Sequence, residues 1–429
     1  MSHVLPNLAG NQRLRALAAI FLIYFMFAIL LNSVGTVIMQ VIHHYGVSKP
    51  EASILEGYKD IPISVMSFLL ASFLPRLGYK KAMQAGLTLV SLACIVMPLL
   101  PGFAATKALF FCTGVAFALV KVSVYSTVGV LTADARQHAS VLNILEGFFM
   151  VGVLSGSWIF ACFIDASSPD GQGWLNVYWL LAALCGLTLL LVSSADFDTP
   201  VPEKNSSLRD DFMSMLKLMM RPLVLIYIVS AFLYVLIEQG IGSWLPTFNR
   251  EILHMPAAMS VQAASIYAGS LAVGRLSAGL VLRRMGWYPL VNICVIGMGL
   301  LVVLSLPLTS GVTEITGMSW RNAPLAAFVF PLIGLFMAPV YPAINSVMLS
   351  SLPKHLHAAM TGLLVVFSAL GGTTGSMITG YVFGHFDGRL AFYLSLVPLT
   401  IILLSLFLFR RSLGAAASQP LQVKAGAAH

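Results

Sequence analysis

Seven ionisable side chains interrupt stretches of sequence that are otherwise long and apolar. An ionised side chain at the centre of a bilayer costs about 2.5–3.5 kcal/mol on insertion scales, so such residues usually mark sites for an ion, a proton or a solute. Carboxylates in this position accept protons or bind cations, whereas lysine and arginine donate hydrogen bonds to anions. The seven residues are Glu56, Lys59, Asp60, Lys121, Glu146, Glu238 and Arg275.

Depth within the apolar runs distinguishes these residues from one another. Lys121 is separated from the nearest charged residue on either side by roughly 20 Å of helix, and Glu238 by roughly 18 Å or more. We therefore expect both near the middle of the bilayer, and Asp60 by the same count. Glu56 is expected nearer the outer surface and Glu146 nearer the inner surface.

Spacing places three of the charges together. Glu56, Lys59 and Asp60 stand at i, i+3 and i+4, so they share one helix face. In one interpretation the charges form buried ion pairs that fix helix register. In the other they line a water-filled cavity, with Lys121 as an electropositive anchor. We favour the cavity, because an unpaired charge at mid-bilayer is hard to explain by packing. The proton-coupling candidates are Glu56, Asp60, Glu146 and Glu238.

Polar and aromatic residues in the same runs supply further candidates for a substrate site. An amide or an aromatic ring in a membrane helix either lines a cavity or packs at a helix interface, and both interpretations remain open. Arg275 is expected near the inner surface as a gate or structural residue, because it can extend its charge to water. The substrate-binding candidates are Asn32, Lys121, Tyr125, Glu146, Glu238, Gln239, Trp244, Tyr341 and Asn345.

Composition determines the elements that must position these residues. The chain has 429 residues, of which 58% are apolar and 9% charged, against roughly 25% charged in a soluble domain. Such a chain cannot cover itself with a polar surface, and it is too apolar to be disordered. Runs of about 20 apolar residues without strand-like alternation predict an all-α membrane protein of twelve transmembrane helices. The expected spans are residues 14–42, 52–74, 79–100, 103–131, 139–164, 174–194, 222–248, 258–281, 287–309, 324–350, 358–384 and 390–409.

Basic residues indicate the orientation of these spans. With a cytoplasmic N-terminus, most of the 24 Lys and Arg residues fall on the cytoplasmic side, as in membrane proteins generally. We therefore expect a multi-pass protein of the cell (inner) membrane with both termini in the cytoplasm. The net charge of +8 then reflects orientation and not nucleic-acid binding. The five cysteines lie in apolar runs, which is typical of core residues and not of disulfides or metal ligands.

A polar stretch in the middle of the chain predicts its division into domains. Residues 196–221 read as a cytoplasmic linker between a six-helix bundle at 1–195 and a second at 222–411. A short amphipathic segment near Met213–Met220 is expected on the membrane surface. The remaining residues, 412–429, are expected to form a disordered cytoplasmic tail.

Internal repeats support this division. Leu74–Lys81 and Leu282–Pro289 are similar segments that follow the second span of each half. Within the first half, Ser53–Tyr58 (SILEGY) in the second span matches Asn143–Phe148 (NILEGF) in the fifth. An inverted repeat of three helices pairs the second span with the fifth in this way.

The segment after the second span resembles the signature of the major facilitator superfamily. Ala71–Lys81 (ASFLPRLGYKK) has its small residue, glycine and bases, but Pro75 replaces the acid, and Gly274–Gly279 resembles the second-half copy. This resemblance implies two pseudo-symmetric six-helix bundles. The gate or structural residues that it marks are Arg76, Gly78, Lys80, Gly274 and Arg275.

Within that superfamily the chain is most similar to the fucose and glucose–galactose:proton symporters. It departs from them where they carry a proton-titrating carboxylate, because Lys121 aligns there, and Glu56 and Glu146 replace amides. Sugar specificity and the usual proton site therefore do not carry over. The segments similar to this branch are Arg76–Lys81, Phe232–Trp244, Val340–Pro342 and Asn143.

These features favour a secondary active transporter that moves a small polar solute by alternating access, coupled to protons as a symporter. The solute would be sugar-like, an organic anion or a zwitterion. The sequence lacks the nucleotide-binding pattern G-x-x-x-x-G-K-[ST], so an ion gradient would supply the energy. The alternatives are an efflux carrier for a drug or metabolite and a non-transporting membrane sensor.

An enzyme is not expected, because the sequence has neither H-E-x-x-H nor G-x-G-D. Nor do we expect a cofactor, a metal, nucleic acid or an obligate protein partner. The expected partners are the solute, protons and the lipid bilayer.

Overall fold

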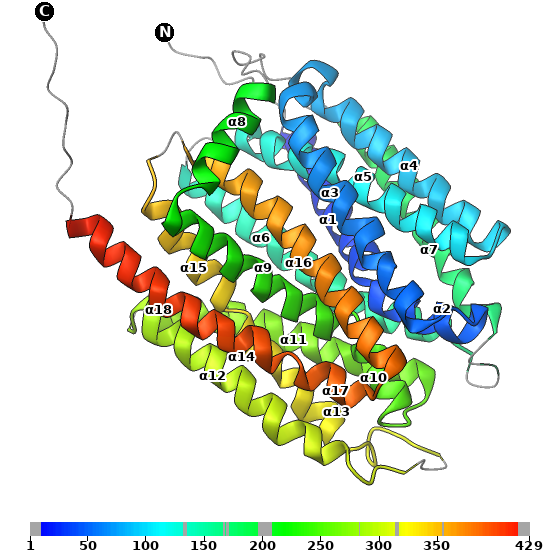
Figure 1. Cartoon of the computed structure of the whole chain (residues 1–429). Helices are drawn as coiled ribbons and strands as arrows, with labels where there is room; N and C mark the ends of the chain where they lie inside the picture. The colour runs from blue at the N-terminus through cyan, green and yellow to red at the C-terminus, as the bar shows by residue number, and fades with distance from the viewer. Residues whose placement is uncertain are drawn as a thin grey trace, which may run out of the picture.

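Every regular element in the described part of the chain is a helix. The computed structural model describes residues 10–131, 135–165, 168, 171–195, 208–282, 284–313, 317–353 and 356–418. The long helices run roughly parallel to one axis. α2, α10 and α17 lie at one end of the bundle, and α8 and the beginning of α1 lie at the other (Figure 1). We call these the α2 end and the α8 end.

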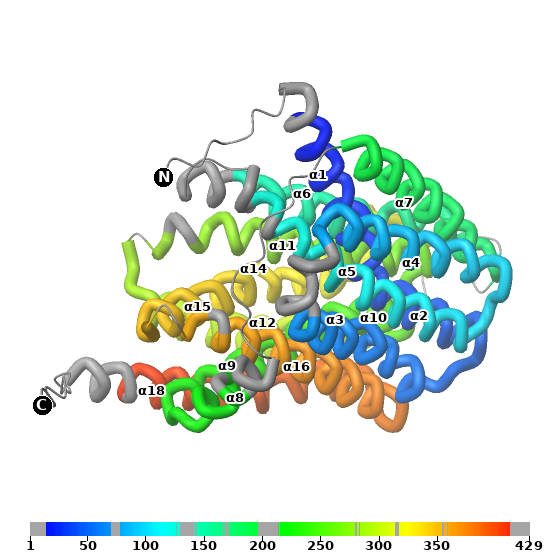
Figure 2. The backbone as a smooth tube through the Cα atoms, turned by 90° about the horizontal axis from the view of Figure 1, so that it is seen from above, coloured from blue at the N-terminus to red at the C-terminus, as the bar shows by residue number. Residues whose placement is uncertain are grey.

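The first half of the chain forms one group of helices and the second half forms another. Figure 2 shows α1 to α7 on one side and α9 to α18 on the other. The first group consists of α1 (Gly10–Asn32), α2 (Val34–Tyr45), α3 (Lys49–Leu77), α4 (Tyr79–Leu99), α5 (Phe103–Leu131), α6 (Ala135–Cys162), η1 (Gln172–Asn176) and α7 (Val177–Ser194). The second consists of α9 (Pro222–Gly242), α10 (Leu245–Glu251), α11 (Ala257–Leu282), α12 (Trp287–Ser305), η2 (Leu306–Thr309), α13 (Ala326–Val329), η3 (Phe330–Leu332), α14 (Ile333–Met337), α15 (Val340–Ser350), α16 (His357–His385), α17 (Gly388–Tyr393) and α18 (Leu396–Ser418).

The helices have the length and composition of membrane spans. Ten segments among the described residues are long and apolar enough to cross a bilayer. α3 and α11, of 29 and 26 residues, are equally long and pack among them. The structure is thus the all-α membrane bundle that the sequence predicts, with α3 and α11 beside the ten apolar spans.

Four of the expected continuous spans are broken into separate α-helices, including the span at 390–409, which divides into α17 and α18. The first is interrupted at Ser33, whose hydroxyl donates to the Leu30 carbonyl at 2.7 Å and so competes with the helix ladder. The span expected at 222–248 ends at Gly242 and restarts as α10, with Pro246 in its first turn. The span at 324–350 divides at Pro331 and Pro339, because proline cannot donate the helical hydrogen bond.

Two pairs of long helices join the halves, and the short helices α2 and α10 also pack together. α3 packs on α16, and α6 packs on α11 (Figure 2). α16 also packs closely on α9, where a Cβ on Gly375 would lie 2.1 Å from the carbonyl oxygen of Leu236. A Cβ on Gly371 would lie 2.4 Å from the carbonyl oxygen of Phe232. Glycine is therefore required at both positions for the backbones to approach this closely.

Two segments differ from the expected domain boundaries. The amphipathic segment lies in α8 (Leu208–Met219), a longer helix that packs on α16 and buries Met215 and Leu218. The tail expected from residue 412 is helical as far as Ser418, because α18 continues through its alanine-rich end. Residues 196–207 of the linker and 419–429 of the tail lie outside the described residues.

Candidate functional site

A polar cavity of about 320 Å³ lies between the two halves. α1 to α3 and α6 contribute to its wall from the first half, and α9 to α11 from the second. Most of the charges that sequence analysis singled out line it, together with apolar side chains such as Phe149 and Met150. Its polar lining residues are Asn32, Thr36, Glu56, Lys59, Asp60, Ser157, Glu238, Gln239, Ser243, Tyr267 and Arg275.

Glu56, Lys59 and Asp60 form one ionic cluster on α3. The Lys59 ammonium lies 2.5 Å from Glu56 Oε1 and 3.4 Å from Asp60 Oδ1. It also donates to the Leu31 carbonyl at 3.4 Å. Glu56 is fully buried, and its other oxygen accepts a hydrogen bond of 2.8 Å from Ser243 in the second half. These charges therefore form buried ion pairs and also line the cavity, so both interpretations of the sequence apply to this cluster.

Asp60 brings this cluster to the contact between α3, α9 and α16. A Cβ added to Gly372 would lie 2.7 Å from Asp60 Oδ2 and 3.1 Å from Cγ of Gln239. A side chain at position 372 would displace the carboxylate or Gln239. Asp60 of the first half thus packs directly against the second half.

A second ionic pair lies across the cavity, within the second half. Arg275 Nη2 on α11 is 3.8 Å from Glu238 Oε1 on α9. Tyr234 donates to the same carboxylate oxygen at 3.4 Å, and the Tyr267 hydroxyl donates to the Glu238 backbone carbonyl at 3.3 Å. The Arg275 side chain is 45% exposed, so this pair can exchange partners with a bound solute more readily than the α3 cluster.

A third polar group lies between α5 and α6, outside the cavity lining. The Tyr125 hydroxyl donates to Glu146 Oε1 at 2.7 Å, and Glu146 is exposed. Glu146 stands one turn before Met150 on α6, on the face that lines the cavity. The Lys121 ammonium lies 5.7 Å from the centre of the Phe117 ring. Among the described carboxylates, none lies within ion-pair distance of Lys121.

The two halves touch through charged and aromatic side chains at the α2 end. Lys49 Nζ lies 2.6 Å from Glu251 Oε2, and it also lies 4.7 Å from the centre of the Phe383 ring. His43 Nε2 is 3.9 Å from Glu251 Oε1. α2 and α3 are thereby joined to α10 and α16, which closes this end of the cavity. Toward the α8 end, by contrast, Glu146 and Arg275 are exposed.

Comparison with known proteins identifies the family. The model of the Major Facilitator Superfamily matches residues 18–375. The chain belongs to this superfamily. The superfamily expected from the residues after the second span is therefore confirmed.

Two proteins that match most of this chain share few of its residues. "Bypass of stop codon protein 6" of Saccharomyces cerevisiae is 24% identical over 394 residues, which are 85% of this chain and 76% of that protein. Among solved structures, a bacterial homologue of the human lysosomal transporter Spinster has a TM-score of 0.74 at 14% identity and covers 96% of this chain and 100% of its own.

Two further structures share the fold. A D323A mutant of the nucleoside transporter NupG has a TM-score of 0.71 at 13% identity, with coverage of 94% and 99%. The E. coli fucose:proton symporter has a TM-score of 0.59 at 15% identity, with coverage of 93% and 99%. At these identities the likenesses concern the fold alone.

Six of the nine expected substrate residues are not among those that line the cavity: Lys121, Tyr125, Glu146, Trp244, Tyr341 and Asn345. Trp244 is fully buried, and its indole nitrogen donates to the Ser376 carbonyl at 3.0 Å, so it packs the contact between α16 and the start of α10. Tyr341 bonds to Ser368 at 3.1 Å on the far side of Tyr234. Asn345 accepts a hydrogen bond from Tyr227.

The expected gate residues have mixed surroundings. Gly78 takes a φ of 87° at the tight connection from α3 to α4, which favours glycine. Lys80 donates to the Ser193 carbonyl at 2.9 Å and so joins α4 to the end of α7. A Cβ on Gly274 would lie 2.4 Å from the Leu335 carbonyl oxygen, where α11 meets α14. The side chain of Arg76 lies outside the described residues.

Sequence reasoning missed several cavity residues. Ser243 and Tyr267 are polar residues within apolar runs, the signal that singled out Asn32, but neither was selected. The contact of Lys49 with Glu251 joins residues 202 positions apart and has no local signal. In the described part of the chain, no three His, Cys, Asp or Glu side chains group closely enough to hold a metal ion.

Proposed function

We propose that this protein is a proton-coupled secondary transporter of a small zwitterionic or polyhydroxylated solute. It would be a carrier and not an enzyme, in the cell (inner) membrane with both termini cytoplasmic. The observation that carries this proposal is the cavity between the halves, which is lined by charges of both signs and closed at the α2 end by contacts between the halves. Rocking of the halves around such a site would expose it to each side in turn.

The charge balance of the cavity supports a zwitterion over a simple anion. Three carboxylates, from Glu56, Asp60 and Glu238, face two bases, Lys59 and Arg275. An ammonium group would find acceptors at the carboxylates, and a carboxylate would find the guanidinium of the partly exposed Arg275. A sugar would bond to the same groups and to the neighbouring amides.

Asp60 and Glu238 are the proposed proton carriers. Each carboxylate is held by one base, Lys59 or Arg275, and each lines the cavity. Protonation of Glu238 would weaken its attraction to Arg275 and free the guanidinium for the solute. Protonation of Asp60 would change the charge at the contact with α16, which links proton binding to the packing of the halves.

Lys121, Tyr125 and Glu146 are proposed to line the route between the cavity and the α8 end. Glu146 is exposed and continues the cavity-lining face of α6 beyond Met150. Its bond to Tyr125 leaves one carboxylate oxygen available. A solute that passed from the cavity along this face would meet these groups next.

A screen followed by transport tests this proposal. Purified protein is heated with amino acids, sugars, sugar acids and drug-like amines, and any compound that raises the melting temperature is then assayed in proteoliposomes with an imposed proton gradient. We expect an amino acid or a sugar to be accumulated against its gradient. Stabilisation by apolar amines alone, with transport into the acidic compartment in exchange for protons, would instead indicate an efflux carrier.

Substitutions of the proposed proton carriers test which residues couple solute transport to protons. Glu238→Gln and Asp60→Asn should abolish gradient-driven accumulation but keep downhill exchange. Glu51→Gln is the matched control, because Glu51 is an exposed carboxylate at the start of α3 that bonds only to nearby Ser48. Full accumulation by both cavity variants would contradict the proposed proton sites.

A further inference from the structure

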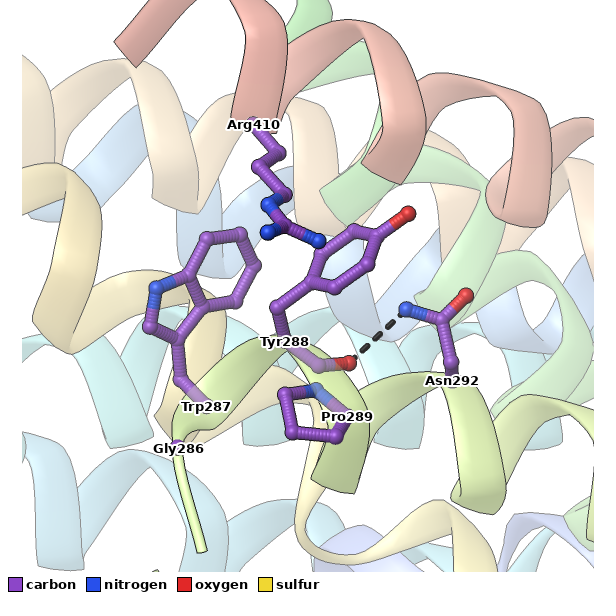
Figure 3. A pocket seen from close by; sticks show the side chains of 6 residues that line it. All are labelled: Gly286, Trp287, Tyr288, Pro289, Asn292 and Arg410. Carbon is purple, nitrogen blue, oxygen red and sulfur yellow. Dashed lines mark hydrogen bonds between the residues drawn. The ribbon is translucent and has the colours of Figure 1, made fainter. Parts of the chain in front are cut away.

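An open pocket of about 580 Å³ lies outside the central cavity, where α12 begins and α18 carries its arginines. Trp287, Tyr288 and Asn292 of α12 and Arg410 of α18 line it, with Gly286 and Pro289. Figure 3 shows the Arg410 side chain extending from α18 over the ring of Tyr288, with Trp287 beside it. The guanidinium carbon lies 4.5 Å from the ring centre.

The polar groups of this pocket leave a cationic donor available. The amide nitrogen of Asn292 donates to the Tyr288 carbonyl at 2.8 Å, so it is already used. Arg410 is exposed, and among the described residues no oxygen accepts a hydrogen bond from it. The stacking on Tyr288 holds the planar guanidinium in place while its N–H groups remain free to bind an oxyanion in the pocket.

Basic residues outnumber acidic ones in the two segments of the chain that form this pocket. The sequence contains no Asp or Glu between Glu251 and Glu314, and none after Asp387. Arg284 nevertheless follows α11, and Arg410 and Arg411 lie on α18, and all three are exposed. These bases would attract a partner with negative charge.

Apolar surface leads from the bilayer to the pocket. α12 and α18 pack against each other, and both expose large apolar side chains along their length. On α12 the exposed Ile293, Ile296 and Leu300 follow directly after the pocket residues, and on α18 the exposed Leu404 and Phe407 precede Arg410. A tryptophan, a tyrosine and an arginine at the end of such a surface are typical of the level of the lipid headgroups.

We propose that this pocket binds an anionic phospholipid. Its phosphodiester would bond to the Arg410 guanidinium between Trp287 and Tyr288, and an acyl chain would lie along the exposed face of α12. This inference does not rest on the proposed transport function, because the pocket shares no residue with the central cavity.

Binding of defined lipids to the purified full-length chain tests the proposal. Affinities for dioleoyl-phosphatidylglycerol and dioleoyl-phosphatidylcholine are measured in detergent by native mass spectrometry. We expect phosphatidylglycerol to bind more tightly, and Arg410→Gln to lower its affinity by about fivefold or more. Arg411→Gln is the matched control, because it removes the same charge one residue away, outside the pocket lining, and should change the affinity less than twofold.

A second measurement locates the acyl chain. Dibrominated phosphatidylglycerol should quench tryptophan fluorescence in the wild-type chain, and Trp287→Phe should remove a distinct part of this quenching. Equal losses of affinity in the two arginine variants would overturn the site, since they would indicate diffuse attraction only. Full competition by glycerol phosphate without acyl chains, together with unchanged quenching in Trp287→Phe, would instead indicate a site for a soluble anion and overturn the lipid proposal.

Discussion

The sequence Ile-Leu-Glu-Gly occurs on both α3 and α6, and its two copies lie in opposite environments. Glu56 of the first copy is fully buried, bound to Lys59 at 2.5 Å and to Ser243 of the other half. Glu146 of the second copy is exposed and bonds to Tyr125 of its own half. The same four residues thus form part of a closed contact at one place and an open surface at the other.

The glycines of the two copies differ in the same way as the glutamates: Gly57 is closely packed and Gly147 is not. A Cβ on Gly57 would lie 2.8 Å from Thr373 Cγ2 on α16, whereas a Cβ on Gly147 would meet no atom within 4 Å. Because the local sequences match, the difference arises from the partner half and not from the helix itself. Contact between the halves at the α2 end therefore decides which copy is buried.

Neutralising the buried carboxylate should give the largest effect. Glu56→Gln leaves the buried Lys59 with a single carboxylate, so the free energy of unfolding should fall by about 3 kcal/mol. Glu146→Gln should change it by less than about 1 kcal/mol, because water replaces the lost interaction. Unfolding in mixed detergent micelles measures both.

The double variant Glu56→Gln/Lys59→Met serves as the control for this prediction. It also removes the base that pairs with Asp60, so it should be less stable than Glu56→Gln, which keeps the pair of Lys59 with Asp60. Equal destabilisation by Glu56→Gln and Glu146→Gln would show that the two copies do not differ in the way described.

Local features of this comparison were predictable from the sequence, and long-range ones were not. Spacing of three and four residues predicts that Glu56, Lys59 and Asp60 share a face, and the structure pairs them. Apolar length predicts the helical bundle. The bond from Ser243 to Glu56 joins positions 187 apart, so no periodicity reports it.

The position of a residue along a helix also does not predict which side of the helix its side chain lies on. Lys121 is far from other charges along the sequence, which suggested an anchor in a central cavity. In the structure its ammonium lies over Phe117, one turn earlier on α5, and it is not among the residues that line the cavity. Trp244 likewise fills the contact with α16 and does not reach the cavity.

Adding one methyl group at each glycine should give the next largest effect. Gly57→Ala inserts a Cβ against the stiff Thr373 side chain and should destabilise the chain by about 1–2 kcal/mol. Gly147→Ala enters open space in a helix and should be neutral or stabilising by up to about 1 kcal/mol. Melting temperatures of the two variants provide the test, and the prediction fails when Gly147→Ala is the more harmful.

Removing the ion pair at the α2 end should give water access to the buried region around Glu56. Lys49→Met removes the ion pair with Glu251, a partly exposed pair worth about 1 kcal/mol, while it keeps the apolar stem over Phe383. A cysteine at position 243 should then react with a water-soluble maleimide about fivefold faster. The exposed Cys162 and half-buried Cys112 are replaced by serine beforehand. An unchanged rate would show that this ion pair does not hold the end closed.

Removing the hydroxyl of Tyr125 should give the smallest effect. Tyr125→Phe eliminates the hydrogen bond to the exposed Glu146, and the free energy of unfolding should fall by less than about 1 kcal/mol. Tyr234→Phe, at the more buried Glu238, is the comparison variant and should cost more. The reverse order would contradict the assignment of the α5–α6 group to an open surface.

Distances measured at both ends of the molecule test the central claim most directly, namely that a charged cavity lies between two halves that open at alternate ends. Spin labels at positions 48 and 254 report the α2 end, and labels at 144 and 281 report the α8 end, in nanodiscs at acidic and neutral pH. We expect the two distance distributions to shift in opposite directions when the pH changes. A single unchanged distribution at both ends, also in the presence of a stabilising solute, would contradict this claim.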